Sequence, residues 1–223
     1  MNKIILITPS YRLKNLKIIK KNINFEYILK WIIVYDENKI SNNSKLFEHN
    51  ENIVEIFYKP KKGENLGNSQ RNLGLEYVNK YFREQDFFLY FLDDDNIIHD
   101  NFYYLLTTLK KDKIYTFDQQ RTRYILNGTK PKLYHIDLAM FVAHFKLISE
   151  IRFKDYDYNA DGIYIEDCYK KNLSNHTYIN KVGCYYNYLS RNVFKRALYL
   201  IFWKIKNFLT IIGFIKKTFR NKP

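Results

Sequence analysis

The chain has 223 residues, of which 46% are hydrophobic and 18% aromatic, and this composition excludes an intrinsically disordered protein. Its two cysteines, Cys168 and Cys184, lie in unrelated segments, so neither a zinc site nor a disulfide framework is expected. The net charge of +14 is concentrated at one end: residues 191–223 contain nine Lys or Arg and no Asp or Glu, which leaves 28 basic against 23 acidic residues elsewhere. Without a dispersed basic surface, nucleic acid is not an expected partner.

A strand–helix–strand pattern opens the chain. The apolar run Ile4–Ile7 predicts a buried strand, and it is too short for the apolar region of a secretory signal peptide. A basic helical stretch follows at Leu16–Lys21, and a second apolar run at Trp31–Tyr35 ends in Asp36. This order of elements predicts an α/β fold. The short apolar run and the cysteine content together favour a reducing, cytoplasmic location.

The next elements are a strand, a loop and a helix. A strand is expected at Ile53–Tyr58, and a glycine- and proline-containing loop at Lys59–Asn68. Ser69 is a candidate N-cap for the helix that follows, which would place Arg71 and Asn72 near the helix N-terminus. Apolar residues then recur at helical spacing: Leu73, Tyr77, Val78, Tyr81 and Phe82.

An acidic run directly follows a buried strand. The strand is Phe87–Leu92 and the run is Asp93-Asp94-Asp95-Asn96. Ligand sites in open α/β sheets lie beyond the carboxyl ends of strands, and clustered carboxylates are tolerable when a hard divalent cation or a ribose lies among them. The run therefore predicts a metal and nucleotide site. The alternative is a solvated acidic turn, because Asp and Asn are good turn residues.

The second half is predicted to contain a further helix, two strands, a hairpin or loop, a second helix and a closing segment. In chain order these are 101–109 (helix), 113–117 (strand), 121–132 (loop or hairpin), 134–145 (strand), 163–173 (helix) and 178–188 (closing segment). Asn127-Gly128 is the turn signal of the hairpin. The strand at 134–145 would carry Asp137, and the last helix would begin just beyond Asp161-Gly162.

The C-terminal segment differs in kind from the rest. Residues 192–223 show apolar residues at helical spacing with Lys and Arg at the margins, which predicts a basic amphipathic helix. Its longest uncharged run, Asn207–Ile215, is far shorter than the roughly 20 residues that span a bilayer. An anchor on an anionic membrane surface is expected, and packing on the domain or on a partner protein is the alternative. The chain is thus divided into a domain at 1–191 and a tail at 192–223.

Several motifs together resemble those of GT-A glycosyltransferases. They are Thr8–Arg12, Asp36, Gly67–Leu75, the acidic run 93–96 and Ile136–Met140. Pro-Ser-Tyr in the first motif and Arg-Asn-x-Gly-Leu in the third are similar to bacterial family-2-like enzymes, whereas Asp-Asp-Asp-Asn and Ile-Asp-Leu-Ala-Met are similar to segments of the animal β-1,3-glucuronyltransferases. The resemblance covers about residues 4–191. It implies a single α/β domain of the GT-A type with a mixed, mainly parallel sheet.

The same resemblance implies site residues. The nucleotide sugar would be bound by Pro9, Tyr11, Arg12, Asp36, Arg71, Asn72, Asp93, Asp94, Asp137 and Arg191. Mn²⁺ or Mg²⁺ would be held by Asp95, Asp93 and Asn187, although related enzymes often have His where Asn187 stands. Either Glu166 or Asp167 would be the general base, and the sequence does not choose between them.

The resemblance implies a metal-dependent, inverting glycosyltransferase that takes a hexosyl or glucuronosyl group from a UDP-sugar. The acceptor would be a lipid-linked or surface glycan, as in capsule or lipooligosaccharide synthesis. The basic tail predicts a peripheral location on the inner face of the membrane. One alternative is a nucleotidyltransferase, which would bring a glycine-rich phosphate loop that Thr8–Arg12 lacks. The other is a non-catalytic, membrane-binding scaffold.

Overall fold

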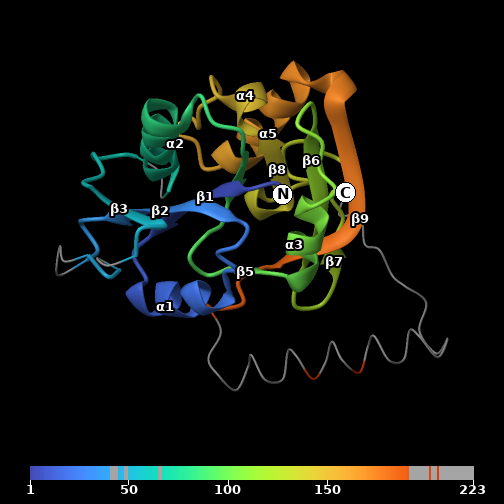
Figure 1. Cartoon of the computed structure of the whole chain (residues 1–223). Helices are drawn as coiled ribbons and strands as arrows, with labels where there is room; N and C mark the ends of the chain where they lie inside the picture. The colour runs from blue at the N-terminus through green and yellow to red at the C-terminus, as the bar shows by residue number, and fades with distance from the viewer. Residues whose placement is uncertain (41–44, 48–49, 65–66, 191–200, 202–204, 206–223) are drawn as a thin grey trace.

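The computed structural model describes residues 1–40, 45–47, 50–64, 67–190, 201 and 205. Nine strands of this part form one sheet, in which β3-β2-β1-β4-β8-β6-β9-β5 are neighbours in this order and β7 pairs with β6 (Figure 1). The strands are β1 (Ile4–Ser10), β2 (Ile28–Asp36), β3 (Ile53–Tyr58), β4 (Phe88–Phe91), β5 (Ile97–Ile98), β6 (Ile114–Gln120), β7 (Ile125–Leu126), β8 (Phe141–His144) and β9 (His176–Tyr185). Arg191 and nearly all of the predicted tail lie outside the described residues.

The sheet is mixed, as predicted. The strands β3, β2, β1 and β4 are parallel to one another, and β6 is parallel to β9. The remaining pairings, β4 with β8, β6 with β8, β6 with β7 and β5 with β9, are antiparallel. Parallel pairing is therefore concentrated in the N-terminal half, where the strand–helix–strand pattern predicted it.

Helices cover both faces of the sheet (Figure 1). On one face α1 (Leu13–Asn22) and α3 (Asp100–Leu106) bury Leu16, Ile19 and Phe102 against the sheet. On the other face lie α2 (Asn68–Phe82), α4 (Phe145–Ile148) and α5 (Ala160–Lys171). Two short 3₁₀ turns occur at Leu138–Met140 and Leu173–Asn175. None of the described helices is long and apolar enough to cross a bilayer.

Two helix starts differ from the predictions. The N-cap of α2 is Gly67 at φ 91°, so Ser69 lies inside the first turn and does not cap the helix. Glycine reaches this left-handed conformation at little cost, and its backbone N–H donates to Gln70 Oε1 at 2.9 Å. Helix α5 begins at Ala160 and not beyond Gly162, which places Asp161 in its first turn.

The strand predicted around Asp137, at 134–145, is shorter in the structure. Residues 134–137 precede a 3₁₀ turn, and the strand β8 starts only at Phe141. Asp137 caps the 3₁₀ turn by accepting a hydrogen bond from the backbone N–H of Ala139 at 3.1 Å. Side-chain capping of this kind competes with strand pairing, and it accounts for the difference.

The hairpin at 121–132 is confirmed, but its turn is not at Asn127-Gly128. Strands β6 and β7 are joined by residues 121–124, and Gly128 lies beyond β7. The backbone N–H of Gly128 donates to Asp118 at 3.1 Å, and an ideal Cβ at Gly128 would lie 2.4 Å from the backbone oxygen of Phe117. Close approach of two backbone segments therefore explains this glycine.

Gly128→Ala is expected to destabilise the fold by about 1–3 kcal/mol, because the new methyl group forces the Phe117 backbone away. Thermal or denaturant unfolding measures this loss. Thr129→Ala, a change at the exposed neighbouring position, is the matched control and is expected to leave stability within about 0.5 kcal/mol. Equal stability of both variants would contradict the close approach.

The strand order creates one point at which polar side chains gather. The chain runs outward from β1 to β2 and β3, and α2 then returns it to β4 on the other side of β1. The carboxyl ends of β1, β2 and β4 therefore meet at a topological switch point, where open α/β sheets bind ligands. Ser10, Asp36 and the acidic run 93–95 lie at these ends.

Candidate functional site

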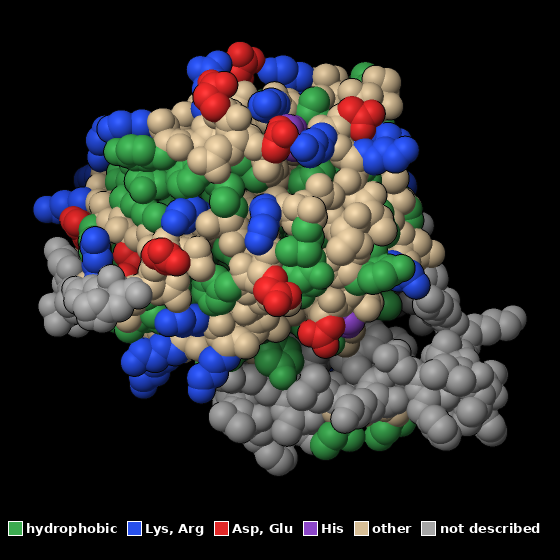
Figure 2. All heavy atoms as spheres, in the orientation of Figure 1, with side chains coloured by type: hydrophobic (Ala, Val, Ile, Leu, Met, Phe, Trp, Pro, Cys, Tyr) green, Lys and Arg blue, Asp and Glu red, His purple; other side chains and the backbone are tan. Residues whose placement is uncertain are grey.

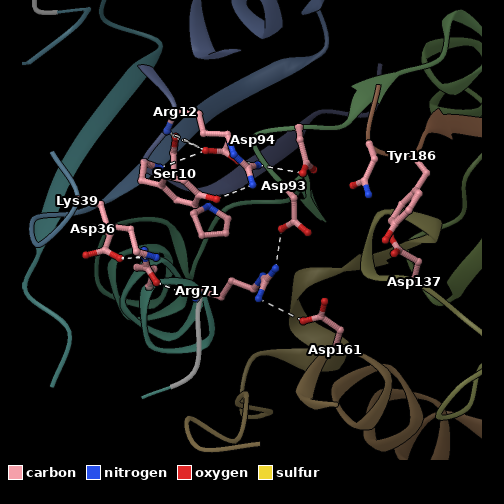
Figure 3. A pocket seen from close by; sticks show the side chains of 16 residues that line it. Ser10, Arg12, Asp36, Lys39, Arg71, Asp93, Asp94, Asp137, Asp161 and Tyr186 are labelled. Atoms are coloured by element: carbon pink, nitrogen blue, oxygen red, sulfur yellow. Dashed lines mark hydrogen bonds and ion pairs between the residues drawn. The ribbon is translucent and has the colours of Figure 1, made fainter. Parts of the chain in front are cut away.

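A cleft of about 260 Å³ lies at this switch point (Figure 3). Its walls come from the ends of β1, β2 and β4, from the first turns of α2 and α5, and from the residues after β9. The lining residues are Pro9, Ser10, Tyr11, Arg12, Asp36, Lys39, Gly67, Gln70, Arg71, Asp93, Asp94, Asp95, Asp137, Asp161, Tyr186 and Asn187.

Asp94 holds the loop between β1 and α1. Its Oδ2 accepts hydrogen bonds from the Ser10 hydroxyl at 2.8 Å and from the backbone N–H groups of Tyr11 and Arg12 at 3.1 and 3.0 Å. Its Oδ1 accepts from Arg12 Nη1 at 2.5 Å, and the residue is only 3% exposed. With its oxygens engaged in this way, Asp94 is an anchor of the loop that forms one wall of the cleft.

Asp94→Asn is expected to lower stability by about 2 kcal/mol or more, because an amide has one acceptor oxygen and turns an NH₂ group toward donors that the carboxylate satisfied. Denaturant unfolding at neutral pH measures the loss. Asp112→Asn, at an exposed position, is the control and is expected to be neutral. A variant as stable as wild type would show that Asp94 is not an anchor.

Asp95 is the carboxylate of the run with the least compensated charge. Burial and the nearby charge of Asp93 raise the pKa of Asp95 to about 6, although Arg12 opposes the shift. Arg12 Nη1 donates to Asp95 Oδ2 at 2.9 Å, and 15% of the Asp95 side chain is exposed. A raised pKa means that burial and the neighbouring carboxylates disfavour the ionised form of Asp95, a cost that a nearby positive charge would offset.

Arg71 is a buried cation between two carboxylates. Its Nη2 donates to Asp93 Oδ1 at 2.5 Å and its Nη1 lies 3.2 Å from Asp161 Oδ1 (Figure 3). Burial opposes the Arg71 charge, but Asp161 and Asp93 outweigh it and raise the pKa of Arg71. Gly67 makes room for the guanidinium, since a Cβ there would lie 2.9 Å from Nη1. The Nε–H has no acceptor within the described part of the chain and remains a donor.

Asp161 faces the cleft from the first turn of α5. Its side chain is 37% exposed, yet desolvation by the walls, together with the charges of Asp93 and Asp137, raises its pKa to about 6 against the opposing effect of Arg71. A carboxylate with this pKa is ionised at neutral pH and is a far stronger base than an ordinary Asp. It has the properties of a general base.

The wall beside β2 contains the residues expected near a nucleobase. Asp36 is 3% exposed and lies 3.3 Å from Lys39 Nζ. Tyr11 is 39% exposed, and its ring is flanked by Arg12, whose Cζ is 4.5 Å from the ring centroid, and by Lys39, whose Nζ is 4.6 Å from it. Pro9 completes this wall, so the three predicted residues Pro9, Tyr11 and Asp36 are brought together.

The opposite wall is formed by Asp137, Tyr186 and Asn187. Asp137 accepts a hydrogen bond from Gln119 Nε2 at 2.8 Å and lies 3.5 Å from Arg121 Nη2, while burial and Asp93 raise its pKa. Arg121 in turn stacks on the Tyr186 ring, with Cζ 4.0 Å from the centroid. Asn187 adopts a positive φ of 50°, a conformation that Asn tolerates better than most residues.

Three predicted site residues of the described part, Asn72, Glu166 and Asp167, do not line the cleft. Glu166 accepts from the Leu133 backbone N–H at 3.0 Å and pairs with Lys170 at 2.8 Å, and these contacts lower its pKa. In a helix Glu166 and Asp167 are turned by about 140° and 240° from Asp161, onto other faces. Asn72 binds the backbone of Phe153 at 2.9 Å through both its amide atoms and so ties helix α2 to the segment around Phe153.

Lys39, Gln70, Asp161 and Tyr186 line the cleft without having been predicted as site residues. Gln70 lies inside the motif Gly67–Leu75 and Tyr186 is next to Asn187, so a search of the neighbours of the predicted residues would have found these two, whereas Asp161 lies five residues before Glu166. Nothing in the sequence marks Lys39. It reaches the cleft because the turn after β2 brings it back over Asp36.

The charges of the lining fit a divalent cation bound together with an anionic ligand. Six carboxylates line the cleft against the three cations Arg12, Lys39 and Arg71. The described residues contain no group of three or more His, Cys, Asp or Glu side chains placed to hold a metal by themselves. Mg²⁺ and Mn²⁺ are commonly bound by one or two carboxylates plus substrate phosphates, and Asp95, Asp93 and Asn187 offer such a partial set of oxygen ligands.

No family model matches this chain, and no curated protein matches it in sequence. In structure it is similar to residues 1–349 of TarS from S. aureus, with a TM-score of 0.58 and 12% identity over 82% of this chain. It is also similar to the mannosyltransferase PcManGT from Pyrobaculum calidifontis, solved in complex with GDP-Man and Mn²⁺, with a TM-score of 0.54 and 12% identity over 92% of this chain.

This chain spans 60% of the TarS chain and 64% of the PcManGT chain. A third structure, described as a glucose-1-phosphate thymidylyltransferase from Bacillus anthracis in complex with sucrose, has 16% identity over 89% of this chain and 95% of that one, and its TM-score of 0.47 is too low to bear on the fold. At these identities the likeness concerns architecture. The chain is an α/β domain with a mixed sheet and a fold similar to that of GT-A glycosyltransferases.

Proposed function

We propose that the protein is a metal-dependent glycosyltransferase that uses a nucleoside diphosphate sugar. The observation that carries this proposal is the cleft at the switch point, where the excess of carboxylates over cations and the raised pKa of Asp95 favour a bound divalent cation. The fold similarity to a mannosyltransferase solved with GDP-Man and Mn²⁺ supports it.

In this proposal the wall of Pro9, Tyr11 and Asp36 receives the nucleobase. The buried Asp36 carboxylate accepts a hydrogen bond from a base N–H, and Tyr11 offers a partly exposed ring. Uracil presents such an N–H, and the proposed donor is a UDP-sugar. Arg12 and Arg71, which pair with the acidic run, would contact the diphosphate.

Asp95 and Asp93, with the amide oxygen of Asn187, would hold Mn²⁺ or Mg²⁺ in this cleft. When bound, such an ion neutralises charge on the diphosphate and makes it a better leaving group. The protein contributes the carboxylates and keeps Asp93 in place through Arg71. The guanidinium of Arg12 already holds Asp95, so a bound ion shares that carboxylate with Arg12.

Asp161 is our candidate for the general base, in preference to Glu166 or Asp167. An acceptor hydroxyl oxygen attacks the anomeric carbon, its proton passes to the Asp161 carboxylate, and the bond from the anomeric carbon to the diphosphate oxygen breaks. Displacement from the side opposite the nucleotide inverts the anomeric configuration. The cleft supports this choice because Asp161 lies in its lining on α5, whereas Glu166 is engaged by Lys170 and Leu133.

The acceptor is proposed to be a glycan on a lipid carrier, at the inner face of a cytoplasmic membrane. This part rests on the sequence of residues 191–223, which contain nine cations and no acid. Capsule or lipooligosaccharide synthesis would use such an acceptor. The sugar itself is set by the cleft around Asp137 and Arg121, whose pairing can recognise hydroxyl or carboxylate groups.

Calorimetric titration with UDP, GDP and CMP, each with Mn²⁺ and with a chelator, tests the proposal. We expect UDP to bind in the presence of Mn²⁺ and to lose affinity with chelator. Turnover of UDP-sugars with release of UDP then separates a glycosyltransferase from a nucleotidyltransferase, which would release pyrophosphate from a nucleoside triphosphate. Absence of binding by every nucleotide under both conditions would overturn the proposal and favour a non-catalytic scaffold.

A further inference from the structure

Helix α1 presents a cationic stripe on its outer face. Its inner face is fixed by Leu16 and Ile19, which are fully buried against the sheet. The exposed positions recur at helical spacing and therefore lie on one side: Lys14, Lys17, Ile18 and Lys21. The ammonium groups of these three lysines and the side chain of Ile18, which is 36% exposed, thus face away from the domain.

No carboxylate offsets this stripe within the helix. Residues 13–22 contain no Asp or Glu, and the ion pairs of the described residues include no lysine of α1. Lys20 lies to the side, with Nζ 4.8 Å from the centre of the Phe47 ring. In Figure 2, Lys and Arg side chains gather at the lower left of the molecule, where Figure 1 places α1. Two exposed lysines of other segments, Lys111 and Lys171, pair with Asp86 and Glu150.

The stripe begins beside the cleft and lies on the same side of the sheet as Leu189. Helix α1 begins at Leu13, directly after Arg12 of the cleft lining. At the other end of the chain, Leu189 is buried in the same core cluster as the inner face of α1, and the backbone N–H of Leu189 donates to Asp95 O at 2.8 Å. Leu189, two residues before the basic segment 191–223, therefore lies on the side of the sheet that carries the stripe.

We propose that the outer face of α1 docks on an anionic lipid bilayer. The lysines lie against lipid phosphates, and Ile18 enters the headgroup region, as in interfacial helices. Because α1 starts at the cleft, this contact holds the cleft close to the bilayer surface, where a lipid-linked acceptor is presented. The orientation thus rests on the proposed function, whereas the binding of α1 to lipid does not depend on it.

The full-length chain with Lys14, Lys17 and Lys21 replaced by Gln tests the proposal. Gln keeps helix propensity and an unbranched polar side chain but removes the charge. The matched control replaces three exposed lysines distant from α1 in the chain, Lys62, Lys80 and Lys154, by Gln, so both variants have the same net charge. Binding is measured by co-sedimentation with vesicles of phosphatidylcholine and phosphatidylglycerol, and with vesicles of phosphatidylcholine alone.

We expect the α1 variant to lose at least about tenfold in affinity for anionic vesicles, and its binding to depend less steeply on salt, while the control variant matches wild type. Equal losses in both variants, or no loss in either, would overturn the proposal. Binding to duplex DNA that falls in the α1 variant while vesicle binding stays would assign the stripe to nucleic acid and also overturn it.

Two further measurements keep this outcome separate from the proposed function. Thermal unfolding is expected to be unchanged in the α1 variant, because the replaced side chains are exposed. Mn²⁺-dependent UDP binding is likewise expected to be unchanged, since none of the three lysines lines the cleft. Loss of vesicle binding in a variant that still binds UDP would establish docking by α1, whatever reaction the cleft performs.

Discussion

Asp161→Asn is expected to lower sugar transfer by about 10²–10⁴-fold while nucleotide binding is kept, because Asn cannot take a proton from the acceptor hydroxyl. Asn has nearly the same volume as Asp and leaves Arg71 paired with Asp93 at 2.5 Å, so the cleft is expected to keep its shape. Initial rates at saturating UDP-sugar measure the chemistry, and calorimetry with UDP measures the donor site separately.

Glu166→Gln and Asp167→Asn are the matched controls for this prediction. Both lie on α5 and both are isosteric changes of charge, but neither residue lines the cleft. We expect each to keep transfer within about threefold, since surface changes seldom alter function or stability much. If Asp161→Asn transferred sugar normally and either control lost most of its activity, the general base would be Glu166 or Asp167, as the sequence indicated.

The pH dependence of transfer distinguishes the same candidates. The pKa of Asp161 is raised to about 6, so the base becomes protonated, and inactive, as pH falls through this value. The pKa of Glu166 is lowered, so a Glu166 base would stay ionised to below its ordinary range. We expect the rate at saturating donor to fall about tenfold per pH unit below about pH 6. A flat profile down to pH 5 would exclude Asp161.

The positions at strand ends were predictable from sequence because two local signals agree there. An unbroken apolar run predicts a strand buried on both faces, and the polar residue after it must then lie at the sheet edge. Asp36 and the run 93–95 follow this rule, and they do meet in one cleft. The parallel order of the strands then explains why these residues meet, since it brings the carboxyl ends of β1, β2 and β4 to the same edge of the sheet.

The start of α5 was not predictable from local signals. Gly162 is unfavourable inside a helix and indicated a turn, so the helix was expected beyond it. In the fold, a Cβ at Gly162 would lie 3.1 Å from Leu133 Cα, and the glycine permits the 133–134 loop to pack against the first turn. A contact between segments distant in sequence thus decided which carboxylate of 161–167 faces the cleft.

The roles of Asp94 and Asp95 were likewise beyond the sequence. Three adjacent carboxylates look equivalent in a motif, yet Asp94 is engaged by four donors of the β1–α1 loop, whereas Asp95 retains a raised pKa. The difference depends on where Ser10 and the backbone of Arg12 lie, which only the folded loop determines. Two isosteric variants can separate an anchor from a cation ligand.

Asp95→Asn is expected to weaken Mn²⁺-dependent UDP binding by about 100-fold or more, roughly 2.8 kcal/mol, because it removes the carboxylate with the strongest demand for a cation. Calorimetry with Mn²⁺ and UDP measures the loss. Binding in the presence of chelator is expected to change little, since Arg12 and Arg71 remain. An unchanged Mn²⁺ effect in this variant would remove Asp95 from the proposed ligand set.

Although Asp95→Asn is expected to weaken nucleotide binding, it is not expected to lower the stability of the fold. This contrast between binding and stability would identify Asp95 as a functional charge. Because the folded-state pKa of Asp95 is raised to about 6, the ionised form destabilises the fold as pH rises through that range, and a neutral Asn relieves the cost at neutral pH. Asp95→Asn should therefore unfold at the same or a higher denaturant concentration than wild type, whereas Asp94→Asn should unfold at a lower one. In a cation site at this sheet edge, we expect the Asp95 carboxylate to lower stability and the Asp94 carboxylate to stabilise its loop. If both variants lost stability equally, the acidic run would be only a structural turn.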